Sequence, residues 1–122
     1  MKPGRTGLKR IAYATLYSSK GLAFAWRRES AFRQELVLAL VMLPAAVWLG
    51  DGPVEVSLLA GSCFLVVIVE LLNTAIEAAV DRVGPELNEL AGGAKDVGSA
   101  AVFVSLLLTA FVWGTVALAR FG

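Results

Sequence analysis

Residues 56–82 read VSLLAGSCFLVVIVELLNTAIEAAVDR. The first thirteen of them, VSLLAGSCFLVVI, carry no charge, whereas the second half adds two glutamates, an asparagine and an aspartate. A run of about 20 predominantly apolar residues is long enough to cross the hydrocarbon of a bilayer as an α-helix. The stretch therefore predicts a membrane helix, and its polar second half requires a separate explanation.

The rest of the chain has the composition of a membrane protein. Of its 122 residues 57% are hydrophobic, and the mean hydropathy is +0.72. Two further apolar stretches, at 30–49 and 96–119, flank the first one. A chain of this length leaves room for one domain. We therefore expect an all-α membrane protein with a single domain over residues 1–122 and membrane helices at 30–49, 56–82 and 96–119.

The basic residues are distributed unevenly. Eight of the eleven Lys and Arg residues fall in residues 1–33, and none falls in the segment DGPVE at 51–55. Arg82 and Lys95 flank the segment between the second and third apolar stretches. Because Lys and Arg are enriched in cytoplasmic loops, we expect the N-terminus and residues 81–97 on the cytoplasmic side and the C-terminus on the outer side.

The segment at 6–27 contains too few apolar residues to cross a membrane, but its apolar residues recur with helical periodicity. Leu8, Ile11 and Leu16 fall on one face, and Lys9 and Arg10 lie largely off it. This pattern is typical of a helix that lies on the membrane surface with its cations near anionic headgroups. An ordinary basic segment that anchors the first membrane helix explains the same residues.

The polar residues of the second stretch share one face of the predicted helix. Asn73, Glu77 and Asp81 lie about 300°, 340° and 20° around the helix from Glu70. Acidic residues inside a membrane helix are costly and indicate a functional site. Two alternatives remain: polar residues that hold helices together through hydrogen bonds, and the lining of a proton or ion path. The outer half of the helix, with only Ser57 and Ser62 as polar side chains, does not continue such a path.

Polar residues at the ends of the neighbouring helices extend this acidic stripe. Glu29 and Glu35 lie near the start of 30–49, and Lys95 and Asp96 near the start of 96–119. Carboxylates are ligands for Mg²⁺, cations offset polyphosphate charge, and a carboxylate within the membrane can accept a proton from a hydroxyl. Together these groups predict phosphoryl transfer from a nucleotide to a lipid alcohol. The absence of histidine excludes histidine metal sites and Ser-His-Asp triads.

The segments WRRESAFRQE at 26–35, VELLNTAIEAAVDR at 69–82 and AKDVGSAAV at 94–102 resemble the prokaryotic diacylglycerol kinase family. The resemblance extends from Arg10 through Trp113. It implies a homotrimeric kinase of the bacterial cytoplasmic membrane, with three membrane helices, an amphipathic surface helix and active sites shared between subunits. It also implies that ATP phosphorylates the free hydroxyl of diacylglycerol to give phosphatidic acid, with Mg²⁺ as cofactor and without a nucleic-acid partner.

The same resemblance implies roles for individual residues. Glu70 would be the catalytic base, and Glu29 and Glu77 would bind the metal. The nucleotide would be bound by Arg10, Tyr17, Glu29, Asn73, Glu77, Glu86, Asn88, Lys95 and Asp96. The lipid substrate would be bound by Arg10, Ala31, Arg33, Glu35, Trp48, Glu70, Ser99 and Trp113.

Two positions depart from the family pattern, and one alternative substrate remains. Asn88 stands where the family has a histidine, and Gly93 where a basic residue is common, so the nucleotide contacts of residues 86–93 are the least supported. FRQE at 32–35 and GSAA at 98–101 favour the diacylglycerol branch over the undecaprenol kinases of the same family.

Overall fold

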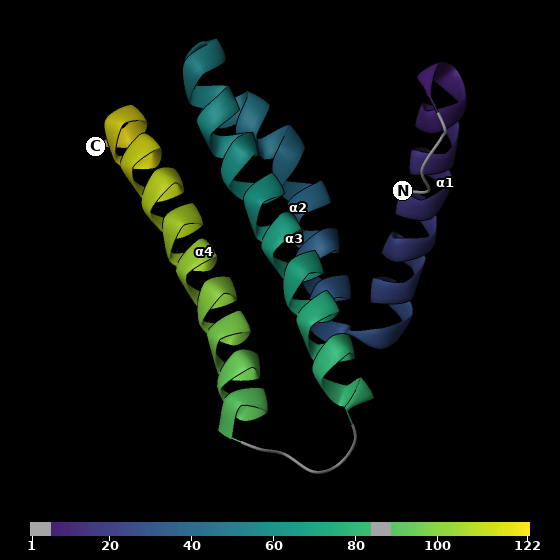
Figure 1. Cartoon of the computed structure of the whole chain (residues 1–122). Coiled ribbons are helices and arrows are strands. Elements are labelled where there is room, and N and C mark those ends of the chain that lie inside the picture. The colour runs from purple at the N-terminus through teal and green to yellow at the C-terminus, as the bar shows by residue number, and fades with distance from the viewer. Residues whose placement is uncertain (1–5, 84–88) are drawn as a thin grey trace.

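The computed structural model describes residues 6–83 and 89–122, which form four helices and contain no strand (Figure 1). The helices are α1 (Gly7–Arg28), α2 (Ser30–Leu49), α3 (Pro53–Arg82) and α4 (Glu89–Phe121). The last three are long and apolar enough to cross a membrane. The prediction of an all-α chain is thus confirmed for the described residues, and the three apolar helices are consistent with a multi-pass membrane protein.

The turn between α2 and α3 starts the third helix earlier than the expected residue 56. Gly52 precedes the helix with a φ of +89°, a conformation that glycine adopts without a Cβ clash. Pro53 follows at the first helical position, where its missing N–H has no partner to lose. The Glu55 carboxylate accepts a hydrogen bond from the Asp51 N–H at 2.9 Å. Residues 53–55 are therefore part of the helix.

The start of α4 also differs from the expectation. The sequence AGGA at 91–94 suggests a flexible hinge, but these residues are helical, and α4 begins at Glu89. Two helical glycines cost about 1 kcal/mol each relative to alanine. The alanines on either side favour the helix, and Gly93 and Ala94 line a pocket together with Ile76 of α3. The expected hinge was wrong, because residues 91–94 continue α4 as regular helix.

Helix α3 is the centre of the bundle, with α2 and α4 packed antiparallel along it (Figure 1). A small core of Ala46, Leu49, Leu59 and Val116 joins the three helices near the α2–α3 turn. The remaining apolar surface of the spans is exposed, for example 64% of Val41 and 71% of Leu118. These exposed side chains suit contact with lipid or with other copies of the chain.

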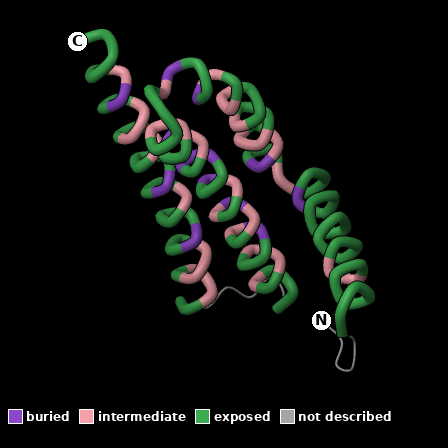
Figure 2. The backbone as a smooth tube through the Cα atoms, turned by 90° about the horizontal axis from the view of Figure 1, so that it is seen from above, coloured by how far each residue is buried: buried purple, intermediate pink, exposed green. Residues whose placement is uncertain are grey.

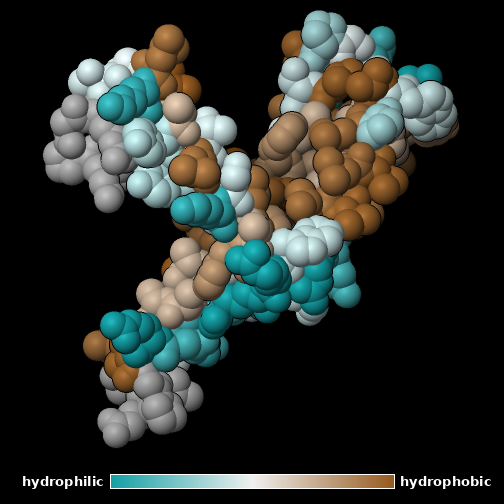
Figure 3. Space-filling view, turned by 90° about the vertical axis from the view of Figure 1, so that its right-hand side faces the viewer, coloured by the Kyte–Doolittle hydropathy of each residue, from teal (hydrophilic) through white to brown (hydrophobic). Residues whose placement is uncertain are grey.

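Helix α1 diverges from this bundle (Figures 1 and 2). Its only buried residue is Ala25, close to the junction with α2, and Leu8 and Ile11 are 84% and 62% exposed. Figure 3 shows hydrophobic side chains over the bundle and hydrophilic ones gathered where α1 meets it. The position of α1 on a membrane surface stays a prediction.

Candidate active site

Four carboxyl groups approach one another where α1 joins α2. Glu29 is the single residue between these two helices, and its extended backbone (φ −120°, ψ 118°) turns the chain. Glu77 and Glu70 act electrostatically on Glu29, and Glu35 and Glu77 act on Glu70. Only 4% of Glu70 is exposed, and no hydrogen bond joins it to another described residue. We call Glu29, Glu35, Glu70 and Glu77 the acid cluster.

Glu29 and Glu77 form a carboxyl pair within the acid cluster. A hydrogen bond to Glu77 is the main reason why the pKa of Glu29 rises from 4.5 to about 7; burial and the charge of Glu77 add to the rise. Arg28 opposes it, with its Nε 3.8 Å from the Glu29 Oε1 atom. Near neutral pH Glu29 is therefore partly protonated.

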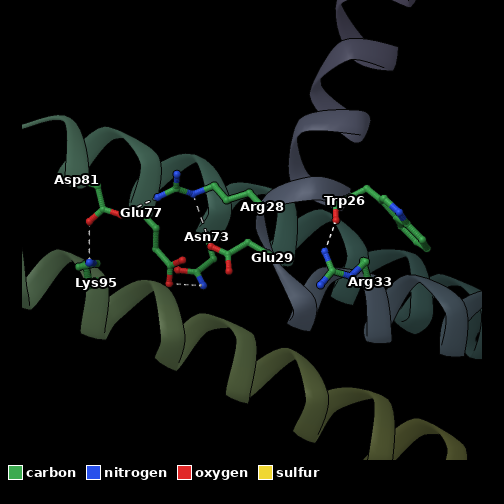
Figure 4. Close-up of polar contacts among 8 residues, drawn as sticks. All are labelled: Trp26, Arg28, Glu29, Arg33, Asn73, Glu77, Asp81 and Lys95. Atoms are coloured by element: carbon green, nitrogen blue, oxygen red, sulfur yellow. Dashed lines mark hydrogen bonds and ion pairs between the residues drawn. The ribbon is translucent and has the colours of Figure 1, made fainter.

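Asn73 and Gly98 support this pair from α3 and α4. The Asn73 Nδ2 donates a long hydrogen bond of 3.4 Å to the Glu77 Oε2 atom (Figure 4). The Asn73 Oδ1 atom is buried without a hydrogen-bond partner. It lies against buried Gly98, so closely that a Cβ at residue 98 would clash with it. The amide keeps its place because α4 has no side chain there.

The composition of the acid cluster fits a hard cation. No group of three His, Cys, Asp or Glu residues that could hold a metal occurs in residues 6–83 and 89–122. Mg²⁺ needs only one or two protein carboxylates, because water and phosphate oxygens complete its shell. The Glu29 and Glu77 carboxyl groups provide this donor set once Glu29 loses its proton. Their chemistry is therefore compatible with Mg²⁺.

An ion triad lies beside the acid cluster. Asp81 accepts a hydrogen bond of 2.6 Å from the Arg28 Nη2 atom and one of 2.8 Å from the Lys95 Nζ atom (Figure 4). These three residues come from the end of α1, the end of α3 and the start of α4. Glu77 also acts electrostatically on Lys95. The triad thus brings a cation to the edge of the acid cluster.

The other predicted nucleotide contacts lie farther away or outside the described residues. Arg10 and Tyr17 are exposed on α1, where Tyr17 stacks on Tyr13 at a centroid distance of 6.4 Å. Asp96 is exposed beside Lys95. Two further predicted residues, Glu86 and Asn88, lie outside the described residues. Among the described residues of one chain, the predicted nucleotide contacts Glu29, Asn73, Glu77 and Lys95 lie close together.

The predicted lipid contacts divide between the two ends of the bundle. Arg33 donates a 2.6 Å hydrogen bond to the Trp26 carbonyl oxygen at the α1–α2 junction. Ala31 and Ser99 are exposed near the same end. At the opposite end, the Trp48 ring lies tilted against the Phe121 ring, with a centroid distance of 5.9 Å.

Trp113 also lies toward that opposite end, where it is half-buried against α3. Its Nε1 donates to the Leu59 carbonyl and the Ser62 Oγ, both at 3.2 Å. The two tryptophans therefore do not meet Glu70 in a single chain.

Two residues at this site carry no predicted role. Arg28 joins the ion triad, and Gly98 makes room for Asn73. A basic residue in a run such as WRRE gives no signal for a partner 53 positions away. A glycine inside an apolar helix is a weak signal of close helix approach.

Comparison with known proteins identifies the family of the chain. Residues 16–117 match the prokaryotic diacylglycerol kinase family. The diacylglycerol kinase of Escherichia coli strain K12 is 47% identical over 122 residues, which is 100% of both chains. That of Pseudomonas aeruginosa is 50% identical over 115 residues, or 94% of each chain, and that of Haemophilus influenzae is 46% identical over 109 residues, or 89% of this chain and 92% of the relative. The chain is therefore a kinase that belongs to the prokaryotic diacylglycerol kinase family.

Proposed function

We propose that this kinase transfers the γ-phosphoryl group of MgATP to the free hydroxyl of diacylglycerol and releases phosphatidic acid. The observation that carries the proposal is the buried carboxyl of Glu70 beside the hydrogen-bonded Glu29–Glu77 pair. Family membership supports the choice of donor and acceptor, because the relatives are named diacylglycerol kinases. The reaction would take place at the cytoplasmic face of the bacterial inner membrane.

Glu70 is the proposed general base. As the lipid hydroxyl oxygen bonds to the γ-phosphorus and the bond to ADP breaks, Glu70 takes the hydroxyl proton. The lack of hydrogen bonds to described residues leaves its carboxylate oxygens free to accept this proton. Because Glu70 is buried, water is kept away from the transferred phosphoryl group. Water could otherwise accept this group in place of the lipid hydroxyl. A positioned base of this kind contributes about 10²- to 10⁴-fold to a rate.

Glu29 and Glu77 are the proposed metal residues. When bound between them, Mg²⁺ would neutralise charge on the transferred phosphoryl group. Asn73 orients the Glu77 carboxylate through its 3.4 Å hydrogen bond. The remaining proposed nucleotide contacts are Arg10, Tyr17, Glu86, Asn88, Lys95 and Asp96.

The proposed lipid contacts require more than one chain. Trp48 and Trp113 lie at the end of the bundle away from Glu70. Arg33, Glu35, Ala31 and Ser99 lie near the α1–α2 junction or the start of α4. We propose a homotrimer, since the exposed apolar faces of α2 and α4 offer room for packing against other copies. Active sites shared between subunits would combine contacts that one chain separates.

Transfer of labelled γ-phosphate in mixed micelles tests the proposal. Purified protein receives MgATP with diacylglycerol and undecaprenol in the same assay. Label in phosphatidic acid is the expected result. Label in undecaprenyl phosphate instead would assign the same chemistry to the other substrate branch, and label in neither lipid would refute the proposed function.

Metal affinity is expected to depend on pH through Glu29. The pKa of about 7 means that Glu29 holds its proton below this pH and must release it before a cation binds. Affinity for Mn²⁺, used as a spectroscopic substitute for Mg²⁺, should therefore rise about fivefold from pH 6 to pH 7, about tenfold from pH 6 to pH 8, and level off above pH 8. Mn²⁺ titrations followed by electron paramagnetic resonance measure this.

Glu29→Gln is the control for the pH prediction. Glutamine has no titrating proton, so the variant should bind Mn²⁺ more weakly and without the rise between pH 6 and pH 7. An unchanged pH profile in this variant would mean that another group titrates.

The glycine beside Asn73 gives a further prediction. Gly98→Ala should push the Asn73 amide away from Glu77, because the added Cβ would overlap the Asn73 Oδ1 atom. We expect kcat/KM for MgATP to fall about 10-fold, the lower end of what is lost when a group that orients a metal ligand is removed. Steady-state kinetics over a range of Mg²⁺ concentrations measures the change.

Gly114→Ala is the matched control on the same helix. A Cβ at residue 114 meets no atom within 4 Å, so this variant should retain wild-type kinetics. Equal losses in both alanine variants would contradict the positioning of Asn73 by Gly98.

A further inference from the structure

Asp81 occupies an unfavourable place in its own helix. It lies in the last turn of α3, where the free carbonyl groups carry partial negative charge and an acidic side chain is disfavoured. Its side chain is 44% exposed, so burial does not hold it there. Two cations compensate for this unfavourable position. The Arg28 Nη2 atom donates to the Asp81 Oδ2 atom, and the Lys95 Nζ atom donates to the Oδ1 atom.

The two cations come from different helices, and both reach the acid cluster. Arg28 also contacts Glu29 at 3.8 Å, and Glu77 acts electrostatically on Lys95. Asp81 therefore links side chains from the end of α1 and the start of α4 beside the proposed metal residues (Figure 4). A pair of exposed charges contributes little to stability, which makes fold maintenance a weak reason for this arrangement.

We propose that Asp81 is a positioning residue that orients Lys95 toward the phosphate groups of the nucleotide. This inference rests on the proposed function. A lysine ammonium has three donors, and Asp81 accepts one of them at 2.8 Å, which leaves two for phosphate oxygens. Without an anion to hold it, the flexible four-carbon side chain samples many directions in water. Asp81 thus reduces the entropy that Lys95 loses when the nucleotide binds.

Steady-state kinetics of Asp81→Asn tests this role. Asparagine keeps the shape of aspartate but not its charge. We expect the KM for MgATP to rise about 3- to 10-fold, with kcat within about twofold of wild type, as for the loss of a small network of exposed charge pairs. Asp81→Glu retains the charge and should restore most of the affinity. Asp51→Asn makes the same substitution at the opposite end of the bundle and should leave the KM unchanged.

Equilibrium binding of a non-hydrolysable ATP analogue shows whether Asp81 acts through Lys95. In an otherwise unchanged chain, Asp81→Asn should weaken analogue binding by about the same factor as it raises the KM. In a Lys95→Gln background the same substitution should cause no further loss. Additive losses of analogue binding in the double variant would overturn the inference. So would an unchanged KM in Asp81→Asn, or a variant whose kcat and thermal stability both fall while its KM stays constant.

The inference and the proposed function fail in different ways. If wild-type protein binds the analogue but transfers no phosphate to either lipid, the proposed function is refuted. The binding comparison between Asp81→Asn and wild type then still decides the role of Asp81.

Discussion

Glu70→Gln is expected to lower kcat at least about 100-fold, because the amide cannot accept the proton of the lipid hydroxyl. The KM for MgATP should change little, since Glu70 lies on α3 away from the ion triad that contains Lys95. Initial rates in mixed micelles, with both substrates saturating, measure the loss. The fold should survive, because glutamine has nearly the same volume and a neutral side chain is less costly to bury at 4% exposure.

Glu55→Gln is the matched control for this substitution. Glu55 lies in the first turn of the same helix, at the opposite end from the acid cluster. It should keep wild-type kcat. A Glu70→Gln variant that retains more than a tenth of wild-type kcat would show that another group takes the proton.

Glu77→Gln is expected to have an effect of similar size through the metal. Removal of a group that only orients a metal ligand lowers metal affinity or activity about 10- to 100-fold. Loss of a proposed ligand itself should therefore lower kcat/KM for MgATP by at least about 100-fold. The substitution also removes the carboxyl that hydrogen-bonds Glu29 and accepts from Asn73. Mg²⁺ titration of the activity, together with Mn²⁺ binding, measures both consequences.

The two glutamine variants should differ in their response to metal. Excess Mg²⁺ should recover part of the activity of Glu77→Gln, because the second carboxyl, Glu29, remains. The same excess should not help Glu70→Gln. Unchanged Mn²⁺ affinity in Glu77→Gln would place the metal elsewhere.

Helical periodicity was enough to predict which polar residues share a face of α3. Glu70, Asn73, Glu77 and Asp81 follow from a rotation of about 100° per residue. Periodicity does not give their surroundings, which range from 4% exposure at Glu70 to 44% at the Asp81 side chain. These differences arise from α2 and α4, whose rotation about their own axes the spacing of α3 does not determine.

The contacts between distant residues could not be predicted from the sequence. Arg28 and Asp81 are 53 positions apart, and the approach of Gly98 to Asn73 depends on the register between α3 and α4. The start of α4 was also missed, because residues 91–94 are helical despite two glycines. The direction in which α1 leaves the bundle has no signal in its own periodicity.

The tryptophans show a different limit of the sequence. Trp113 was expected among the lipid contacts, yet its indole N–H donates to the Leu59 carbonyl and the Ser62 hydroxyl of α3. The Trp48 ring lies 5.4 Å from the Arg120 guanidinium at the same end of the bundle. Within one chain these rings stabilise helix packing. Their proposed contact with lipid depends on the arrangement of subunits.

The position of a bound metal tests the assignment of the acid cluster most directly. Crystals of the protein with Mn²⁺ and a non-hydrolysable ATP analogue would reveal the cation by its anomalous scattering. We predict a single strong peak within about 2.5 Å of carboxylate oxygens from both Glu29 and Glu77, with Glu70 outside the coordination shell. A peak coordinated by Glu70, or one that touches neither Glu29 nor Glu77, would contradict the division between metal residues and base.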